Sequence, residues 1–325
     1  MKRRILRIIS PIVGIALLLA VTGCAPADEQ QRDVDAQPKP TRIIVADAST
    51  THHLNLYVAK ELGLFEKRGL EVEIIKAEDL AASRDAVVSG QADIFWSCPT
   101  VAIAAIANGA PLKMIAQVKT PCTSVLVVSP DSRIDDYADL DGKSIAGISP
   151  TCEAVIAYSK KAREVGAVFN LEKLAGGPAI IALEAGRVDG AILEEPHTSI
   201  AELKGFNVVL PEAAAQITCR TINARTAFLK DNPEAVKRFI EAVDEANAII
   251  AADPVADRVV EIAVQYTGAP EEAIRHGNAR LKFTTEIQEE GLSALADELV
   301  SLQNIRENPG DALFAEELRG ITWDK

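Results

Sequence analysis

The sequence predicts an α/β protein built as two lobes with a cleft between them, and three observations lead to this architecture. Short apolar segments alternate with helix-like segments over residues 42–118, and the alternation restarts after residue 123. The segment VVSGQADIFWSCP (87–99) also matches LEAGRVDGAILEEP (183–196), because each passes from a helix through Gly and Asp into an apolar strand and then Pro. Past residue 228 the pattern is wholly helical. Two similar lobes and a helical C-terminal tail are therefore expected.

The first lobe is expected to hold a parallel sheet with helices on both faces. The predicted strands are RIIVADAS (42–49), LEVEII (70–75), ADIFWS (92–97) and LKMIAQV (112–118), and the predicted helices lie at 52–69, 80–90 and 99–109. The first helix is indicated by Leu54, Tyr57 and Val58 at helical spacing, and Gly69 marks its end. The third helix has Pro near its start and Gly109 near its end.

The second lobe repeats the pattern with shorter elements. Apolar, β-branched runs predict strands and longer amphipathic runs predict helices: strands in 123–130, 134–149, 188–195 and 207–211, helices at 151–166, 178–186 and 197–205. Hinge strands are expected near Thr120–Ser124 and Thr218–Ile222. The predicted domains are lobe 1 at 42–122 and 223–325 and lobe 2 at 123–222, with the helical tail packed back on the first lobe.

The N-terminal residues carry the features of a lipoprotein signal. A basic start, MKRR, precedes an apolar stretch too short for a permanent membrane span and then VTGC, which resembles a bacterial lipobox. Residues 1–23 are therefore predicted to be a signal peptide and Cys24 the lipidated residue. The alternative is an ordinary signal peptide with an incidental cysteine. Polar, Pro-containing residues 24–41 are expected to form a tether.

The net negative charge of the chain limits the kinds of partner that it is expected to bind. The chain has 34 Lys and Arg against 47 Asp and Glu, and the four basic residues of 1–23 would be lost on cleavage. So acidic a protein is expected to bind neither nucleic acid nor anionic lipid, because both would be repelled. No Walker A motif occurs, so the chain is not expected to be an ATPase.

Several motifs in order form a family pattern. HHLNLYVAKELGLFEKRGLEVEI, SGQADIFWS, IDDYADLDGKSIAG, EAGRVDGAILEEP and FLKDNPEAVKRFIEA resemble solute-binding proteins of ABC importers for nitrate, taurine and sulfonates. The match runs from Arg42 to about Asp253. The resemblance implies the type II periplasmic-binding-protein architecture, in which hinged lobes close on a ligand. It also implies permease and ATPase partners, a periplasmic or extracellular location and, as we expect, a monomeric receptor.

Ligands of open α/β sheets bind beyond the carboxyl ends of the strands, where loops lead into helices. The expected ligand-binding residues are those at such positions: Ser49, Thr51, His52, His53, Ser97, Cys98, Thr100, Cys122, Thr123, Thr151, Cys152, Glu153, Glu195, His197 and Cys219. Exposed N–H groups at helix starts favour an anionic ligand.

The four cysteines beyond the predicted tether all fall at these junctions, and none lies in the helical tail. Three interpretations remain open: two disulfides, buried free thiols, or thiolate ligands of a soft metal or iron–sulfur cluster formed by Cys98, Cys122, Cys152 and Cys219. A Cys98–Cys152 disulfide would lock the hinge. The absence of any C-x-x-C spacing weighs against the metal.

Other polar and aromatic residues have ordinary alternatives. His52 and His53 are either ligand contacts or the polar first turn of a helix. One of Glu194 and Glu195 is expected to face solvent. Trp96 is expected in the core or a site wall, and His276 at the surface. The residues at the strand-to-helix loops are therefore the main evidence about function in the sequence.

A non-catalytic, lipid-anchored receptor that captures a small organic anion or a metal-linked species is the expected function. The alternatives are an iron- or metal-dependent enzyme related to thiamine-pyrimidine synthesis and a sensory binding subunit. The pyrimidine-synthesis relatives of the family carry a run of adjacent cysteines, and this sequence has none. No cofactor is certain from the sequence.

Overall fold

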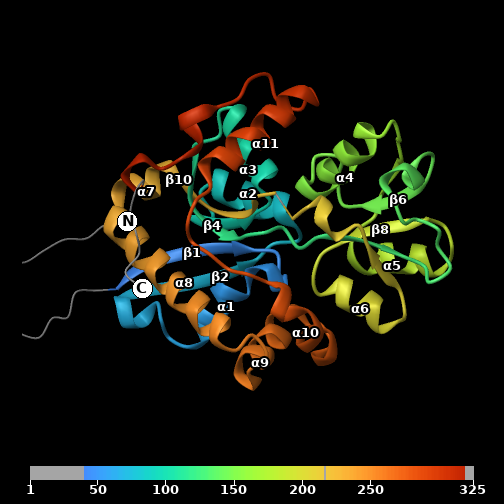
Figure 1. Cartoon of the computed structure of the whole chain (residues 1–325). Helices are drawn as coiled ribbons and strands as arrows, with labels where there is room; N and C mark the ends of the chain where they lie inside the picture. The colour runs from blue at the N-terminus through green and yellow to red at the C-terminus, as the bar shows by residue number, and fades with distance from the viewer. Residues whose placement is uncertain (1–39, 216, 319–325) are drawn as a thin grey trace, which may run out of the picture. The chain divides into compact units, whose positions relative to one another are not determined.

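Two five-stranded sheets organise the protein (Figure 1). The computed structural model describes residues 40–215 and 217–318. The predicted signal peptide, Cys24 and nearly all of the predicted tether lie outside these residues. The α/β fold with two lobes is confirmed, and each lobe is defined below by its sheet and the helices that cover it.

The first lobe has the strand order β2-β1-β3-β10-β4. Its strands are β1 (Thr41–Asp47), β2 (Leu70–Lys76), β3 (Ile94–Ser97), β4 (Leu112–Lys119) and β10 (Cys219–Arg225). Both faces are buried: Ile94 and Trp96 belong to one apolar cluster, and Phe95 between them belongs to the other. The prediction that Trp96 is a core residue is confirmed, because its ring is fully buried and packs edge-on against Phe239.

Helices cover the two faces of this sheet in two groups (Figure 1). One group is α1 (Leu54–Glu61), α8 (Pro233–Ala252) and α9 (Asp257–Thr267); the other is α2 (Leu80–Val88), α3 (Pro99–Ala107) and α11 (Glu289–Ser301). Continuous apolar runs such as β3 are typical of strands covered on both sides.

The second lobe has the strand order β7-β6-β8-β5-β9. Its strands are β5 (Val125–Val128), β6 (Ser144–Gly147), β7 (Asn170–Lys173), β8 (Gly190–Leu193) and β9 (Asn207–Val209). Helix α4 (Glu153–Glu164) packs on one face, and α5 (Gly176–Glu184) with α6 (His197–Leu203) packs on the other. Short 3₁₀ turns at 137–140 and 211–213 complete this lobe.

The sheets are mixed, whereas the alternating pattern predicted a parallel one. Strand β10 runs antiparallel to β3 and β4, and β5 runs antiparallel to β8 and β9. Each exception is a strand next to a crossing between the lobes, so it enters its sheet from the opposite end. The predicted residue boundaries of the lobes stay a prediction.

The predicted helix at 52–69 is divided into three pieces. A 3₁₀ turn (Thr51–His53) precedes α1, which ends at Glu61, and a second 3₁₀ turn (Glu66–Arg68) follows. Gly63 has φ of +66°, a left-handed conformation that ends the helix early.

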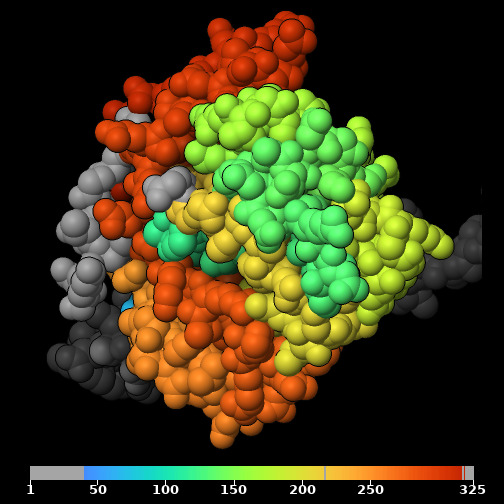
Figure 2. Space-filling model, turned by 45° about the vertical axis from the view of Figure 1, so that its right-hand side comes forward, coloured from blue at the N-terminus to red at the C-terminus, as the bar shows by residue number. Residues whose placement is uncertain are grey.

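The C-terminal tail is helical as expected, but it contacts both lobes. After α7 (Thr226–Asp231), helices α8 and α9 pack on α1, and α11 packs on α3. Helix α10 (Glu271–Gly277) instead packs on α6 of the second lobe, and a 3₁₀ turn (Asn278–Arg280) continues it. In Figure 2 the orange residues of this part of the tail lie against the yellow residues of the second lobe. Two further 3₁₀ turns, Gly310–Leu313 and Glu316–Leu318, follow α11.

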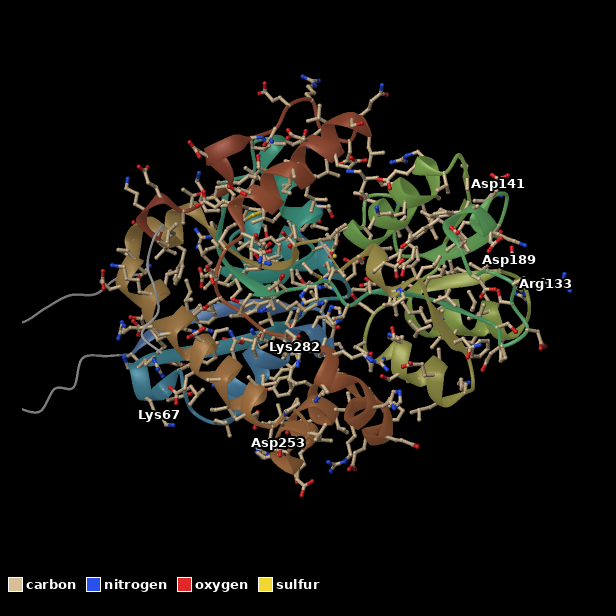
Figure 3. The ribbon with its side chains drawn as sticks, viewed as in Figure 1. Lys67, Arg133, Asp141, Asp189, Asp253 and Lys282 are labelled. Atoms are coloured by element: carbon tan, nitrogen blue, oxygen red, sulfur yellow. The ribbon has the colours of Figure 1, made fainter. Side chains whose placement is uncertain are left out.

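Charged side chains project from the surface of the described residues (Figure 3). Arg133, Asp141 and Asp189 lie at the outer end of the second lobe in that view. Among residues 40–215 and 217–318, no helix combines the length and apolar character that crossing a membrane requires.

Candidate ligand site between the two sheets

The candidate site lies where strand ends of both sheets meet. Strands β1, β3 and β4 end at Asp47, Ser97 and Lys119, while the antiparallel β10 begins at Cys219. From the second lobe come the residues after β8 and the first turn of α4. This is the edge at which open α/β sheets bind ligands.

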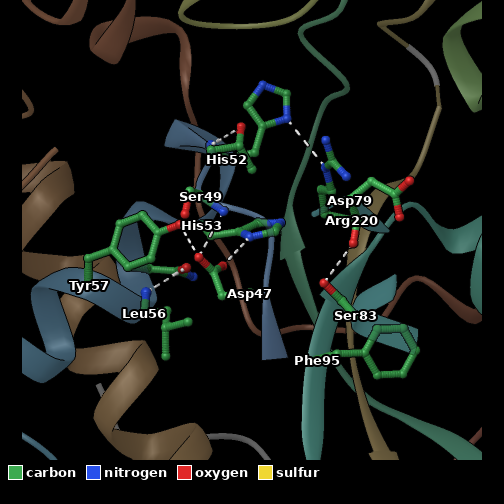
Figure 4. A network of polar contacts seen from close by, with 12 residues as sticks. Asp47, Ser49, His52, His53, Leu56, Tyr57, Asp79, Ser83, Phe95 and Arg220 are labelled. Carbon is green, nitrogen blue, oxygen red and sulfur yellow. Dashed lines mark hydrogen bonds and ion pairs between the residues drawn. The ribbon is translucent and has the colours of Figure 1, made fainter. Parts of the chain in front are cut away.

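Arg220 connects the two lobes and is the centre of the site. Its side chain is 1% exposed and donates from Nη2 to Glu194 Oε2 at 2.5 Å, from Nη1 to Cys98 Sγ at 3.4 Å and from Nε to His52 Nδ1 at 3.4 Å. Figure 4 shows the contact with His52. Burial would lower the pKa of Arg220, but Cys98 and Glu194 raise it, so the guanidinium stays charged.

The backbone at Arg220 is strained. Its φ is +57°, and Ser49, which follows β1, has φ of +54°. Non-glycine residues adopt this left-handed conformation at a cost, and such strain gathers at functional sites. Both residues lie at the junction between the sheets, so the strain marks the same place as the polar contacts.

The four cysteines gather around Glu153. Cys98, Cys152 and Glu153 form one triad and Cys122, Cys219 and Glu153 a second, and the ligand atoms within each triad lie within 4.8 Å of one another. All four are free thiols in this structure. Cys98 and Cys152 are the N-cap residues of α3 and α4, so a helix start from each lobe contributes one sulfur.

Glu153 is a buried carboxylate that lacks one partner. The residue is 2% exposed, and Oε1 accepts a hydrogen bond from the Cys219 thiol at 3.5 Å. Its other oxygen, Oε2, is buried and has no hydrogen-bond partner among the described residues. A buried charge without a partner is costly, so this oxygen indicates a ligand that supplies positive charge or a proton.

Lys119 lies beside the second thiol pair. Its ammonium donates to Thr123 Oγ1 at 3.0 Å and hydrogen-bonds Cys219; burial would lower its pKa, but Cys219 and Cys122 raise it. The hydrogen bond with Cys219 lowers the pKa of Cys122 to about 7, against the effect of burial. Burial is the main cause that raises the pKa of Cys219, and the hydrogen bond with Cys122 raises it further.

A second buried network joins β1 to α1 (Figure 4). His53 Nδ1 lies 2.7 Å from Asp47 Oδ1, and the Tyr57 hydroxyl donates to Asp47 Oδ2 at 2.7 Å. Burial would raise the pKa of Asp47, but His53 and Tyr57 lower it. Burial lowers the pKa of His53, so the neutral ring donates from Nδ1, and Nε2 has no partner among the described residues.

The buried histidines give a prediction about pH. Burial lowers the pKa of His52 and of His53, so the folded protein binds fewer protons than the unfolded chain, in which histidine titrates near 6.5. Their contribution to stability is therefore full above about pH 6.5 and decreases as the pH falls, by up to about 1.4 kcal/mol per pH unit for each ring. Urea unfolding between pH 8 and 5 measures this slope.

The matched variants for the pH prediction are His53→Gln and His276→Gln. His53→Gln should reduce the slope, whereas the change at the surface residue His276 should leave it as in the parent. An equal slope in both variants would contradict the assignment of the slope to His53. The surface position expected for His276 is confirmed, with Nε2 lying 3.3 Å from Glu202.

The structure places most of the sequence-predicted site residues at or next to the candidate site, and it gives Thr151 and His197 other neighbours. It brings together His52, Cys98, Cys122, Thr123, Cys152, Glu153 and Cys219, with Ser49, Thr51, His53, Ser97 and Thr100 at neighbouring strand ends. The hydroxyl of Thr151 forms a hydrogen bond with the hydroxyl of Ser149. His197 packs over Gly176, and burial lowers its pKa. Their roles as ligand contacts stay predictions.

Glu195 has a structural set of partners. It is 2% exposed, accepts from the backbone and hydroxyl of Ser199 through Oε2, and accepts from Arg280 at 2.8 Å through Oε1. Arg280 also pairs with Glu202 of α6 at 2.6 Å. These contacts join the tail to the second lobe beside the candidate site. Glu194, rather than Glu195, reaches Arg220.

Arg220, Lys119 and Asp47 are the functional candidates that sequence reasoning missed. Arg220 directly follows Cys219, and Asp47 lies within the first predicted strand, so both lay within segments already singled out. A charged residue within a segment expected to form a buried strand was the signal available. A surface hollow lined by Asn108, Val300 and residues 303–306 lies at the other end of α3 from Cys98.

Comparison with known proteins gives a family and a fold. A family profile described as NMT1/THI5 like matches residues 50–257. A 4-amino-5-hydroxymethyl-2-methylpyrimidine phosphate synthase of Saccharomyces cerevisiae is 24% identical over 223 residues, which are 63% of this chain. The match spans 65% of the length of that relative.

Solved structures with this fold include binding proteins and an enzyme. The periplasmic aliphatic sulphonate binding protein of Escherichia coli has a TM-score of 0.76 at 19% identity, covering 89% of this chain and 96% of the other. The desulfurization enzyme DszB has a TM-score of 0.64 at 14% identity, and the match covers 85% of this chain and 98% of DszB. The periplasmic-binding-protein fold is therefore shown, and fold alone does not separate binding from catalysis.

Proposed function

This chain belongs to the NMT1/THI5-like family, and from that premise we propose that it is the extracytoplasmic solute-binding receptor of an ABC importer. The likeness in fold to a periplasmic sulphonate-binding protein supports this role. The lipobox-like VTGC supports a lipid anchor at Cys24, which would keep the receptor beside its permease. An importer of this kind needs no catalytic residue in the receptor.

The contact of Arg220 with Glu194 carries the proposal. Arg220 belongs to β10 of the first sheet and Glu194 follows β8 of the second, so one buried charge pair joins the two lobes. A ligand that entered between the lobes would meet Arg220, the thiols and Glu153 at once. Closure of the lobes on such a ligand would add contacts that only the bound state has, which is how a binding protein retains its solute.

Ligand-dependent stability tests the receptor role. We expect one solute from a panel of sulfonates, nitrate, pyrimidines and thiophilic metal ions to raise the melting temperature of the full chain without being consumed. At a hundred times its Kd a ligand adds about 2.7 kcal/mol, which is about 5 °C or more. Mass spectrometry of the solute before and after incubation checks turnover. Conversion of a bound solute to product would overturn the receptor role.

An enzyme is the second candidate, and the Asp47–His53 pair is the observation that favours it. A carboxylate holds the ring by Nδ1, and Nε2 has no partner in the part of the chain that the structure describes, which is the arrangement used by general bases and by metal-binding histidines. The similarity to pyrimidine phosphate synthases points in the same direction. Under this alternative, His53→Gln would abolish turnover while leaving solute binding in place.

A further inference from the structure

We propose that the site between the lobes binds a soft, thiophilic metal ion through its four cysteines and Glu153. This deepens the proposed receptor function and rests on it for the role of the metal as the captured solute. The thiols come from four separate segments of the chain, the loops before α3 and α4, the loop after β4 and the first residue of β10. Only the fold brings them together.

The donor atoms select the class of metal. Each triad offers two sulfurs and one carboxylate oxygen within 4.8 Å of one another. Sulfur ligands favour ions such as zinc, cadmium and copper(I), whereas calcium and magnesium prefer shells of oxygen. Zinc–sulfur bonds of about 2.3 Å place tetrahedral ligands just under 4 Å apart, so small side-chain movements would complete either triad.

The partnerless oxygen of Glu153 is the second, independent observation. Glu153 belongs to both triads, and its Oε2 is buried with no hydrogen-bond donor among the described residues to satisfy it. A thiophilic metal cation would satisfy this oxygen and would also bind the surrounding sulfur atoms. A structural role in hydrogen bonding alone would leave that oxygen buried without a partner.

Buried cations offset the charge of a metal-bound triad. Two thiolates, one carboxylate and one divalent ion leave a single negative charge. Lys119 is bonded to Cys219 and balances that charge in the second triad, whereas Arg220 is bonded to Cys98 but also pairs with Glu194, so it offsets the charge of the first triad only in part. An isolated buried charge is costly, so these cations favour metal binding in a dry site.

The geometry also couples the metal to closure. Cys98 belongs to the first lobe, whereas Cys152 and Glu153 begin a helix of the second. An ion bound in this triad would therefore hold the lobes together, as a captured solute does. The residues Cys98, Cys122 and Cys219 are 5% exposed or less, so the bound ion would be shielded from water and competing ligands.

The experiment is a titration of the reduced full chain with cadmium, kept free of oxygen. We expect a thiolate-to-cadmium absorption band in the ultraviolet that saturates at one or two ions per chain, and a rise in the melting temperature. Glu153→Gln and Cys98→Ser should each weaken binding by about 100-fold. Glu164→Gln, at the exposed far end of the same helix α4, is the matched control and should bind as the parent does.

Three results would overturn the metal proposal. These are no saturable band, equal cadmium affinity in the Glu153→Gln and Glu164→Gln variants, and protein isolated from its own cells with the thiols paired as disulfides, as shown by alkylation and mass spectrometry. An arm with sulfonates in place of cadmium distinguishes the two proposals. If sulfonates alone raise the melting temperature, the receptor role stands and the metal inference fails.

Discussion

Replacing Arg220 by Gln is expected to lower the free energy of unfolding by about 3 kcal/mol and to weaken solute binding strongly. The change removes the buried charge that meets Glu194, Cys98 and His52. Breaking a buried ion pair leaves the other charge uncompensated, which typically costs 3–5 kcal/mol. The Glu194 side chain is 33% exposed, so the lower end of that range applies. Urea unfolding and a binding titration measure the two effects.

Arg225→Gln is the matched control, because Arg225 lies on the same strand. Its partner is Asp93 at 3.0 Å, and both side chains retain access to water. A partly exposed pair contributes about 0.5–1 kcal/mol. Arg220→Lys should recover only part of the loss, since one ammonium does not reproduce three directed contacts. Equal losses in Arg220→Gln and Arg225→Gln would contradict a special role for Arg220.

Gly277→Ala is expected to separate the tail from the second lobe. A Cβ at Gly277 would lie 2.3 Å from Glu195 Oε2 and 2.5 Å from Ser199 Oγ, so either these side chains must leave their present hydrogen bonds or α10 and α6 must move apart. The pairing of Glu195 with Arg280 lies at this contact and would be disturbed. Overpacking of this kind costs about 1–3 kcal/mol. Small-angle scattering and the melting temperature record the change.

The comparison with Gly177→Ala makes the test specific. Gly177 lies in the first turn of α5, a Cβ there would meet nothing within 4 Å, and the backbone has no positive φ. That substitution should be neutral or stabilise by about 0.5 kcal/mol. If Gly277→Ala leaves both the scattering profile and stability at the parent values, the contact between α10 and α6 does not hold the lobes.

Much of the fold was predictable because it depends on local periodicity. The alternation of strand and helix segments reflects the burial of apolar residues, and the two Gly-to-Asp turns reveal the repeated unit. The reversed direction of β10 and β5 was not predictable in this way, since an apolar run looks the same whichever way the strand enters its sheet. The early end of α1 at Glu61 was signalled by Gly63 and not recognised.

The candidate site was predictable in part for a different reason. Strand ends gather at one edge of a sheet, so cysteines at such ends were expected to lie near the cleft. The arrangement of four thiols around one carboxylate was not predictable, because Cys98 and Cys219 are far apart in sequence and share no spacing motif. Arg220 was missed because a cation in a buried strand has no partner visible in the sequence.

The sequence by itself determined which segments form strands and helices, that two lobes exist, and that sulfur and hydroxyl groups lie at the loop ends. The tertiary structure alone decided which of these groups meet. It paired Arg220 with Glu194 across the lobes, placed Lys119 beside one thiol pair and left one oxygen of Glu153 without a hydrogen-bond partner among residues 40–215 and 217–318. The physical reason is that secondary structure follows from neighbours along the chain, whereas a buried polar site depends on distances between segments that only packing brings close.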